Sequence, residues 1–299
     1  PRGKVIGGSS SINAMAYMRG LPHDFDDWEA AGATGWSWAA VQPAFDRIER
    51  RLERSADGKP REQGAGLLTI SDLRDQMNPF SQRFLAAAQD CGWPACDDLS
   101  RTLGESVGYY RSTVRHGLRF SAADAFLTPA RRRPNLQVVS NAMVERVLFD
   151  GSRATGLTYR VGDQTMHVTA GREVILCAGA VNSPKLLQLS GVGPASLLRG
   201  LGVTPLHHLP EVGRGLQDHL AISYMYRATQ PTLNNILGRV PPRLLAGVRY
   251  LMTRRGPLSV PVNQVGGYVQ STPDTTRPDM QIYCNPLSYW NAPDGRPLL

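Results

Sequence analysis

Apolar residues recur at helical spacing in three stretches of the chain. Residues 37–54 carry apolar side chains separated by four, three and four positions, with charged side chains on the opposite stripe, which predicts an amphipathic helix. Residues 80–90 show a second helical pattern, with Ser81 as the candidate N-cap and Gly92 as the stop signal. A third pattern covers residues 239–255, where prolines precede a leucine-rich run.

Strand-like alternation dominates much of the remaining chain. We expect a small meander from residue 135 onward, with turns at Asp150-Gly151 and Gly162-Asp163. The short apolar run 173–177 is typical of a strand buried in a parallel sheet, and a helix should follow it, with Pro184 near its start and Gly191 after its end. The predicted strands are 107–120, 136–139, 143–149, 154–159, 166–169, 173–177, 265–270 and 279–283.

One tryptophan-rich segment and one polar segment are assigned no catalytic or binding role. Trp28, Trp36 and Trp38 precede the first helix, and aromatic residues beside an amphipathic helix usually belong to a core. Residues 55–66 are rich in glycine and charge, which predicts a surface loop at a lobe boundary.

Composition indicates a folded protein with more than one lobe. The chain has 299 residues, of which 41% are hydrophobic and 19% are charged, so it can bury sizeable cores. Its net charge of +8 suits an anionic cofactor or a membrane surface. Nucleic acid is excluded as a partner, because the arginines are dispersed and no nucleic-acid-binding motif is present. Four scattered cysteines favour a reducing, cytoplasmic location without a disulfide framework, and no metal-ligand spacing occurs.

The most informative stretch is residues 2–20, RGKVIGGSSSINAMAYMRG. Gly7 and Gly8, followed by three serines and Asn13, place a backbone turn without side chains beside small hydrogen-bonding groups. Such a turn can lie flat against a large polar ligand. The small residues after Asn13 lead directly into an apolar run, so we expect the turn to be packed into a core.

Three motifs together resemble one enzyme family. Residues 2–20 are similar to the first signature of the glucose-methanol-choline (GMC) oxidoreductases, flavin enzymes that oxidise alcohols. Residues 179–194, GAVNSPKLLQLSGVGP, resemble the second signature, and residues 212–219, VGRGLQDH, resemble a short motif that follows it. The resemblance implies FAD as the cofactor and essentially covers the chain.

The resemblance also implies which residues contact the cofactor. Val144 looks like the residue whose backbone meets the adenine, and Val5 and Asn13 to Ala16 look like the residues around the isoalloxazine and the neighbouring ribityl chain. Ile12 occupies the position at which some family members carry a histidine linked to the flavin, so the FAD should be held non-covalently. The cofactor-binding residues predicted in this way are Val5, Gly8, Asn13, Ala14, Met15, Ala16 and Val144.

By the same resemblance, the chain is expected to be an internal section of a longer enzyme. No strand followed by G-x-G-x-x-G precedes the first signature, and the family's catalytic histidine lies in a region beyond residue 299, so no catalytic residue is assigned. The predicted fold is α/β, with an incomplete doubly wound FAD-binding lobe interleaved with a substrate lobe that contains an antiparallel sheet. The FAD-binding lobe comprises residues 1–65 and 129–225, and the substrate lobe comprises residues 66–128 and 226–299.

The implied reaction is the oxidation of a primary alcohol, choline or an aliphatic alcohol, to the aldehyde. Hydride passes to flavin N5, and the electrons continue to a quinone or another acceptor that is not oxygen. Two alternatives stay open: a lyase of hydroxynitriles on the same scaffold, and a flavin-binding fragment without catalysis.

The helix predicted over residues 239–255 leaves a further question open. Its arginines surround an apolar face, as in helices that lie in a membrane interface. The ordinary explanation, a helix packed on its own lobe, is favoured here. A peripheral membrane contact is the other hypothesis. The residues of the apolar face are Leu244, Leu245, Val248, Leu251 and Met252.

Overall fold

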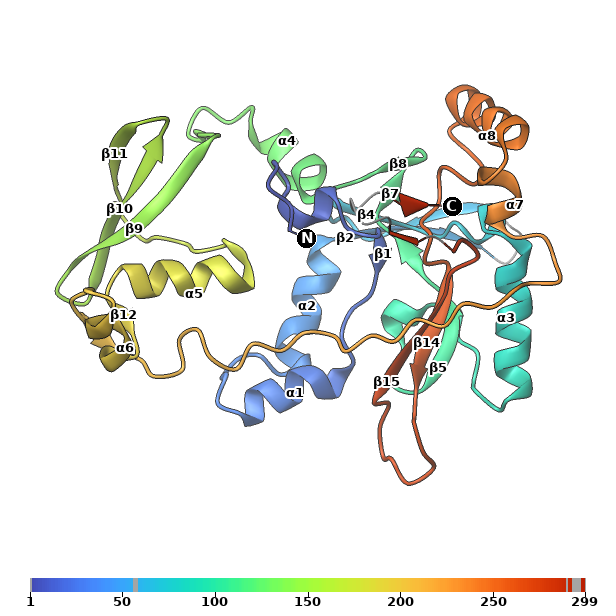
Figure 1. Cartoon of the computed structure of the whole chain (residues 1–299), viewed down its shortest axis with the longest axis horizontal. Coiled ribbons are helices and arrows are strands. Elements are labelled where there is room, and N and C mark those ends of the chain that lie inside the picture. The colour runs from blue at the N-terminus through green and yellow to red at the C-terminus, as the bar shows by residue number, and fades with distance from the viewer. Residues whose placement is uncertain (1, 56–58, 289, 292–296, 299) are drawn as a thin grey trace. The chain divides into compact units, whose positions relative to one another are not determined.

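The computed structural model describes residues 2–55, 59–288, 290–291 and 297–298. The chain divides into two compact units (Figure 1). Unit 1 comprises residues 1–136 and 225–299, and unit 2 comprises residues 137–224.

Unit 1 is built around a five-stranded sheet with the strand order β1-β6-β4-β2-β3. The strands β2 and β4 are parallel, and the other pairs are antiparallel. The loop that contains η1 precedes β1, and two helices connect β1 to β2. The elements of this part are η1 (Gly8–Ser11), β1 (Ala16–Tyr17), α1 (Pro22–Ala30), α2 (Trp38–Ile48), β2 (Glu49–Arg54), β3 (Pro60–Gln63), β4 (Leu68–Ser71) and β6 (Arg111–Ser112).

The helix predicted over residues 37–54 is wrong in its second half. The helix α2 ends at Ile48, and Glu49–Arg54 forms the strand β2. Glu49 and Arg51 are each only 2% exposed, whereas the helical interpretation placed the charges of this segment in solvent. Alternate residues of a strand point to the same side. Here the charged side chains point inward and are neutralised by one another, a pattern that a hydrophobicity argument does not detect.

A network of buried ion pairs holds β2 in the sheet. The Arg51 guanidinium donates to Glu49 at 2.8 Å, to Glu53 at 3.0 Å and to Asp98. The Arg19 guanidinium lies 2.6 Å from Glu49 Oε2, the same carboxylate oxygen that accepts from Arg51. Burial by itself raises the pKa of Glu49, but hydrogen bonds from Arg19, Tyr17 and Arg51 outweigh burial and hold this pKa below its ordinary value.

A second sheet of unit 1 is antiparallel and packs against α3 (Pro79–Asp90). Its order is β15-β14-β5, and Ala88 of the helix joins Val107 and Val269 of the sheet in a buried apolar cluster. The helix was predicted almost to the residue, but its N-cap is Asn78 instead of Ser81. The strands are β5 (Ser106–Tyr109), β14 (Val265–Val269) and β15 (Met280–Cys284).

The remaining elements of unit 1 are short, apart from one helix. That helix, α8 (Val240–Thr253), confirms the helical prediction, but its leucine-rich face is exposed and does not pack on the lobe as we expected. The short elements are η2 (Arg74–Gln76), η3 (Leu99–Arg101), β7 (Val114–Arg115), β8 (Leu118–Arg119), η4 (Ala123–Leu127), α4 (Thr128–Ala130), α7 (Leu233–Leu237), β16 (Trp290–Asn291) and β17 (Pro297–Leu298).

Unit 2 contains the predicted meander, an antiparallel sheet in the order β11-β10-β9. Gly151 and Gly162 take left-handed conformations at its two turns, with φ of 56° and 58°, as the turn sequences predicted. The helix α5 packs against β9, where the Val147 N–H donates to the Ser190 hydroxyl at 2.9 Å. The elements are β9 (Ala142–Asp150), β10 (Arg153–Val161), β11 (Gln164–Thr169), α5 (Gly179–Leu189), β12 (Val192–Gly193), α6 (Ala195–Gly200) and β13 (His207–His208).

Two strand predictions in unit 2 are wrong. Residues 136–139 and 173–177 are extended or irregular without strand pairing, and Ile175 is 74% exposed. A strand exists only where a neighbour pairs with its N–H and C=O groups. Among the described residues no segment does this for 173–177. Pro184 lies in the middle of α5 instead of at its start, because the helix already begins at Gly179.

The tryptophan and loop predictions also need correction. Trp28 and Trp36 are about half exposed. Their rings pack on each other at 5.9 Å, and Trp28 also packs on Phe25, so one side of the pair is left in solvent. Part of the predicted loop 55–66 forms β3, which pairs with β2, and residues 56–58 lie outside the described residues.

The α/β fold class is confirmed. The predicted antiparallel sheet is also present, as β15-β14-β5, in residues that were assigned to the substrate lobe. Within the described part of the chain, no helix is both long enough and apolar enough to cross a bilayer.

We expect Arg51→Met to destabilise the protein strongly. Removal of one partner from a buried ion network leaves uncompensated carboxylates, which costs about 3–5 kcal/mol near pH 7. Urea unfolding measures this loss, and the exposed Arg61→Met on the neighbouring strand is the control, with a change within about 0.5 kcal/mol.

The loss should shrink as the pH falls, because the orphaned carboxylates then take up protons. The parent protein, in contrast, becomes less stable as the pH falls. Since its Glu49 pKa lies below the ordinary value of 4.5, this carboxyl stabilises the fold above that pH, and the stabilisation is lost as the pH falls through the folded-state pKa. Equal unfolding free energies for Arg51→Met and Arg61→Met would contradict the network's role.

Candidate functional site

The loop before β1 has a backbone that only glycine adopts easily. Gly7 and Gly8 both have positive φ, 93° and 57°, and the Gly8 N–H donates to the Val5 carbonyl at 2.8 Å. A Cβ on Gly7 would lie 2.4 Å from the Ser11 hydroxyl, and a Cβ on Gly3 would lie 2.3 Å from the Gly8 carbonyl oxygen. These two glycines are therefore required by the loop's own folding.

Gly8 differs from its two neighbouring glycines. A Cβ added there would meet no atom of the protein within 4 Å. The side of the turn on which Gly8 lies is therefore open, and its backbone can be approached by a ligand.

Two of the three serines, Ser10 and Ser11, fix the loop from inside. Ser10 donates to the Gly7 carbonyl at 2.6 Å, and Ser11 donates to the Ile6 carbonyl at 2.9 Å. The Ser10 hydroxyl also accepts the Ala122 N–H at 2.9 Å, which ties the loop to a segment far along the chain. The serines thus serve the geometry of the turn, and the turn is preorganised.

Asn13 is oriented by two donors to its side-chain oxygen. Its Oδ1 accepts the Met15 N–H at 3.0 Å and an Arg119 guanidinium N–H at 2.7 Å. The Asn13 amide nitrogen, in contrast, donates to no described residue. This arrangement presents an N–H₂ group at the surface of the loop.

Met15, where the chain leaves the loop, has a strained backbone conformation. Its φ is 61°, which is unfavourable for a residue with a long side chain. Its carbonyl accepts the Thr113 N–H at 2.9 Å, and its side chain packs on the core cluster of Leu73, Met77, Val114 and Val260. Met15 therefore faces the core, and Ala16 pairs with Ser112 in the sheet.

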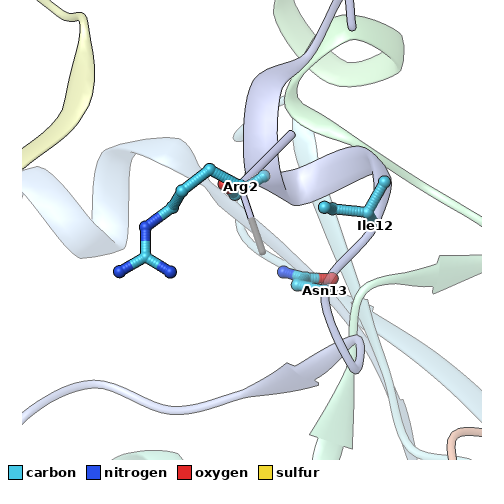
Figure 2. Close-up of a pocket in the computed structure, with 4 residues that line it drawn as sticks. Arg2, Ile12 and Asn13 are labelled. Atoms are coloured by element: carbon cyan, nitrogen blue, oxygen red, sulfur yellow. The ribbon is translucent and has the colours of Figure 1, made fainter. Parts of the chain in front are cut away.

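A hollow of about 370 Å³ lies at the outer side of the loop (Figure 2). Arg2, Ser9, Ile12 and Asn13 line it, and the Arg2 side chain extends away from the other labelled residues. Val5, Ala14 and Ile12, the last of them 50% exposed, also face solvent. The expectation that the turn is packed into a core is therefore wrong for its outer side, which is apolar and open.

Val144, the remaining predicted residue, lies in unit 2. It is half-buried in β9, where it pairs with Tyr159 of β10. In the same unit, α5 begins at Gly179, whose φ is 87° and around whose Cβ position the space is open. The structure thus brings Val5, Gly8, Asn13, Ala14, Met15 and Ala16 together in one loop of unit 1.

Sequence reasoning missed the residues that brace this loop from a distance. Arg119, Ala122 and Thr113 lie about a hundred positions along the chain, and each bonds to the loop. Nothing in the local sequence around Arg119 marks it, because its role depends on a tertiary contact with Asn13. Among the described residues, no cluster of His, Cys, Asp or Glu could hold a metal ion.

Comparison with known proteins assigns the chain to a family. The sequence profile of the GMC oxidoreductases matches residues 1–221. The chain is 40% identical over 295 residues to an alcohol dehydrogenase (acceptor) of Pseudomonas putida, covering 96% of this chain and 52% of the relative. It is 39% identical over 288 residues to the mitochondrial choline dehydrogenase of Homo sapiens, covering 96% of this chain and 48% of the relative.

The fold agrees with a solved structure. An FAD-dependent oxidoreductase from Chaetomium thermophilum superposes with a TM-score of 0.82 at 29% identity, over 90% of this chain and 49% of that one. The chain thus spans about half the length of the relatives that it matches. From the profile match and these identities together, the chain belongs to the GMC oxidoreductase family.

Proposed function

We propose that the loop of residues 5–16 binds the flavin of FAD and that the protein oxidises a primary alcohol to the aldehyde. The observation that carries this proposal is the open Cβ position of Gly8 on a loop whose other glycines are filled by protein atoms. The left-handed φ of Gly8 already favours glycine, and the open space at its Cβ position leaves the backbone accessible to the close approach of a ligand.

The loop offers groups that fit a flavin. Its outer side combines apolar surface from Val5 and Ile12 with the amide N–H₂ of Asn13. A tricyclic ring with one polar edge needs such a combination, apolar contact along a face and few oriented donors. Arg2 adds positive charge beside the hollow, which suits a cofactor that carries phosphates.

When bound, FAD supplies the acceptor for the hydride of the alcohol at N5. The residues of this chain would bind and orient the flavin, and none of them is assigned as the catalytic base. The half-buried Val144 is the proposed contact of the adenine. The family resemblance and the named relatives support choline or an aliphatic alcohol as substrate and a quinone or another non-oxygen acceptor as oxidant.

The flavin should be held non-covalently. Ile12 lines the hollow and has no nucleophilic atom with which to form a bond to the ring. Acid precipitation of the purified protein should release yellow FAD into the supernatant. Flavin that stays with the precipitate after washing would contradict this prediction.

Gly8→Val should abolish flavin retention while the fold persists. The new side chain would occupy the open side of the turn, against which the ring is proposed to lie. Gly162→Val is a matched control, because Gly162 has nearly the same φ, 58° against 57°, and an equally open Cβ position on a hairpin of unit 2.

Both variants carry the same backbone strain, so only a ligand contact separates them. The measurement is the ratio of flavin absorbance to protein absorbance after gel filtration. Normal flavin content in Gly8→Val, or equal loss in both variants, would show that the turn is merely structural.

Anaerobic titration with choline or an aliphatic alcohol tests the reaction itself. We expect the absorbance band of the oxidised flavin, at about 450 nm, to bleach on addition of substrate and to return when a quinone is added. A protein that lyses hydroxynitriles would keep its flavin oxidised throughout. Retention of flavin without bleaching by any alcohol would favour that alternative or a non-catalytic flavoprotein.

A further inference from the structure

The helix α8 of unit 1 has two apolar faces, and only one of them is covered. Ala246 is buried, and the Tyr250 hydroxyl donates to the Gly117 carbonyl at 3.0 Å, so this side of the helix packs on the unit. The helix also contacts α7, and Figure 1 shows the pair at the edge of unit 1. The opposite side is lined by exposed apolar residues, which are Val240, Leu244, Leu245, Val248, Leu251 and Met252.

The exposed apolar face of α8 belongs to a regular helix and not to an irregular segment. Residues 220–226 also expose apolar side chains, but they are extended and unpaired. The helix α8, in contrast, is a complete element of more than three turns with a packed face of its own. A second apolar face on a helix that is already packed is not needed for the helix to fold.

Charge indicates what meets this face. Residues 219–273 contain no aspartate or glutamate, whereas arginines lie at both edges of the exposed stripe, Arg243 on one side and Arg249 on the other. Among the described residues, neither of these two arginines makes an ion pair. Arg254 lies over the Tyr250 ring at 5.2 Å, and Arg255 pairs with Asp75 at 2.6 Å.

We propose that the exposed face of α8 binds the surface of a membrane that contains anionic phospholipids. In such an arrangement the leucines enter the boundary between headgroups and acyl chains, and the flanking guanidinium groups reach the phosphates at headgroup level. A bilayer satisfies the apolar stripe and the two flanking arginines, Arg243 and Arg249, at once. The proposal is independent of which alcohol the protein oxidises.

Vesicle sedimentation of the protein expressed from its complete reading frame tests the proposal. At low salt it should sediment with phosphatidylcholine vesicles that contain phosphatidylglycerol, and much less with pure phosphatidylcholine. Leu244→Glu combined with Leu251→Glu should weaken binding by about tenfold or more, because charges replace the inserted side chains. Leu103→Glu is the matched control, since Leu103 and Leu251 are both 70% exposed, and it should bind as the parent does.

A second variant separates the two parts of the interaction. Arg243→Gln combined with Arg249→Gln should reduce binding to the anionic vesicles by about tenfold or more and leave the weak binding to neutral vesicles unchanged. Flavin content and circular dichroism establish that each variant is folded. A parent protein that stays in the supernatant with both kinds of vesicle overturns the proposal, as does a leucine variant that binds normally. A leucine variant that changes only the oligomeric state assigns the face to a second copy and overturns it as well.

Discussion

The ion network around Glu49 and Arg51 is the interaction on which the geometry of unit 1 depends. It joins β2 to Arg19, the second residue after β1, and so it fixes the chain that leaves the loop of residues 5–16 relative to the sheet. Isolated charges are expensive to bury, and they are tolerated here because each has several oppositely charged partners at short distance. The same arrangement makes the sheet intolerant of partial change, since one missing member leaves the others without compensation.

Contacts with distant parts of unit 1 hold the loop of residues 5–16 in its shape. Thr113 of the chain holds the Met15 carbonyl, the core holds the Met15 side chain, and Arg119 orients the Asn13 amide. The outcome is a rigid turn with a packed inner side and an open outer side. Preorganisation of this kind lowers the conformational cost of binding a large cofactor.

The sequence was sufficient for some of this and insufficient for the rest. Elements with a strong local signal were predicted well, such as the helix over Pro79–Asp90 and the hairpin turn at Gly162. The strand Glu49–Arg54 was missed because its charges resemble a solvated helix face and are paired only through tertiary contacts. The strand predicted over 173–177 was wrong for a different reason. An apolar composition suits a buried strand, but it does not provide a neighbouring strand to pair with. In the loop, residue types indicated that a ligand could approach, but its bracing by Arg119 required the fold.

The three glycines of the loop lead to different patterns of mutational tolerance. Side chains at Gly3 or Gly7 collide with the loop itself, so a library selected only for folded protein should be depleted at both positions. At Gly8 there is room, and asparagine or aspartate, which tolerate the left-handed backbone, should pass the same selection. If the flavin lies against Gly8 as proposed, a selection for flavin-dependent growth would remove them. The loop thus separates, within six residues, the two glycines that its own folding requires from the glycine at which we propose that a ligand lies.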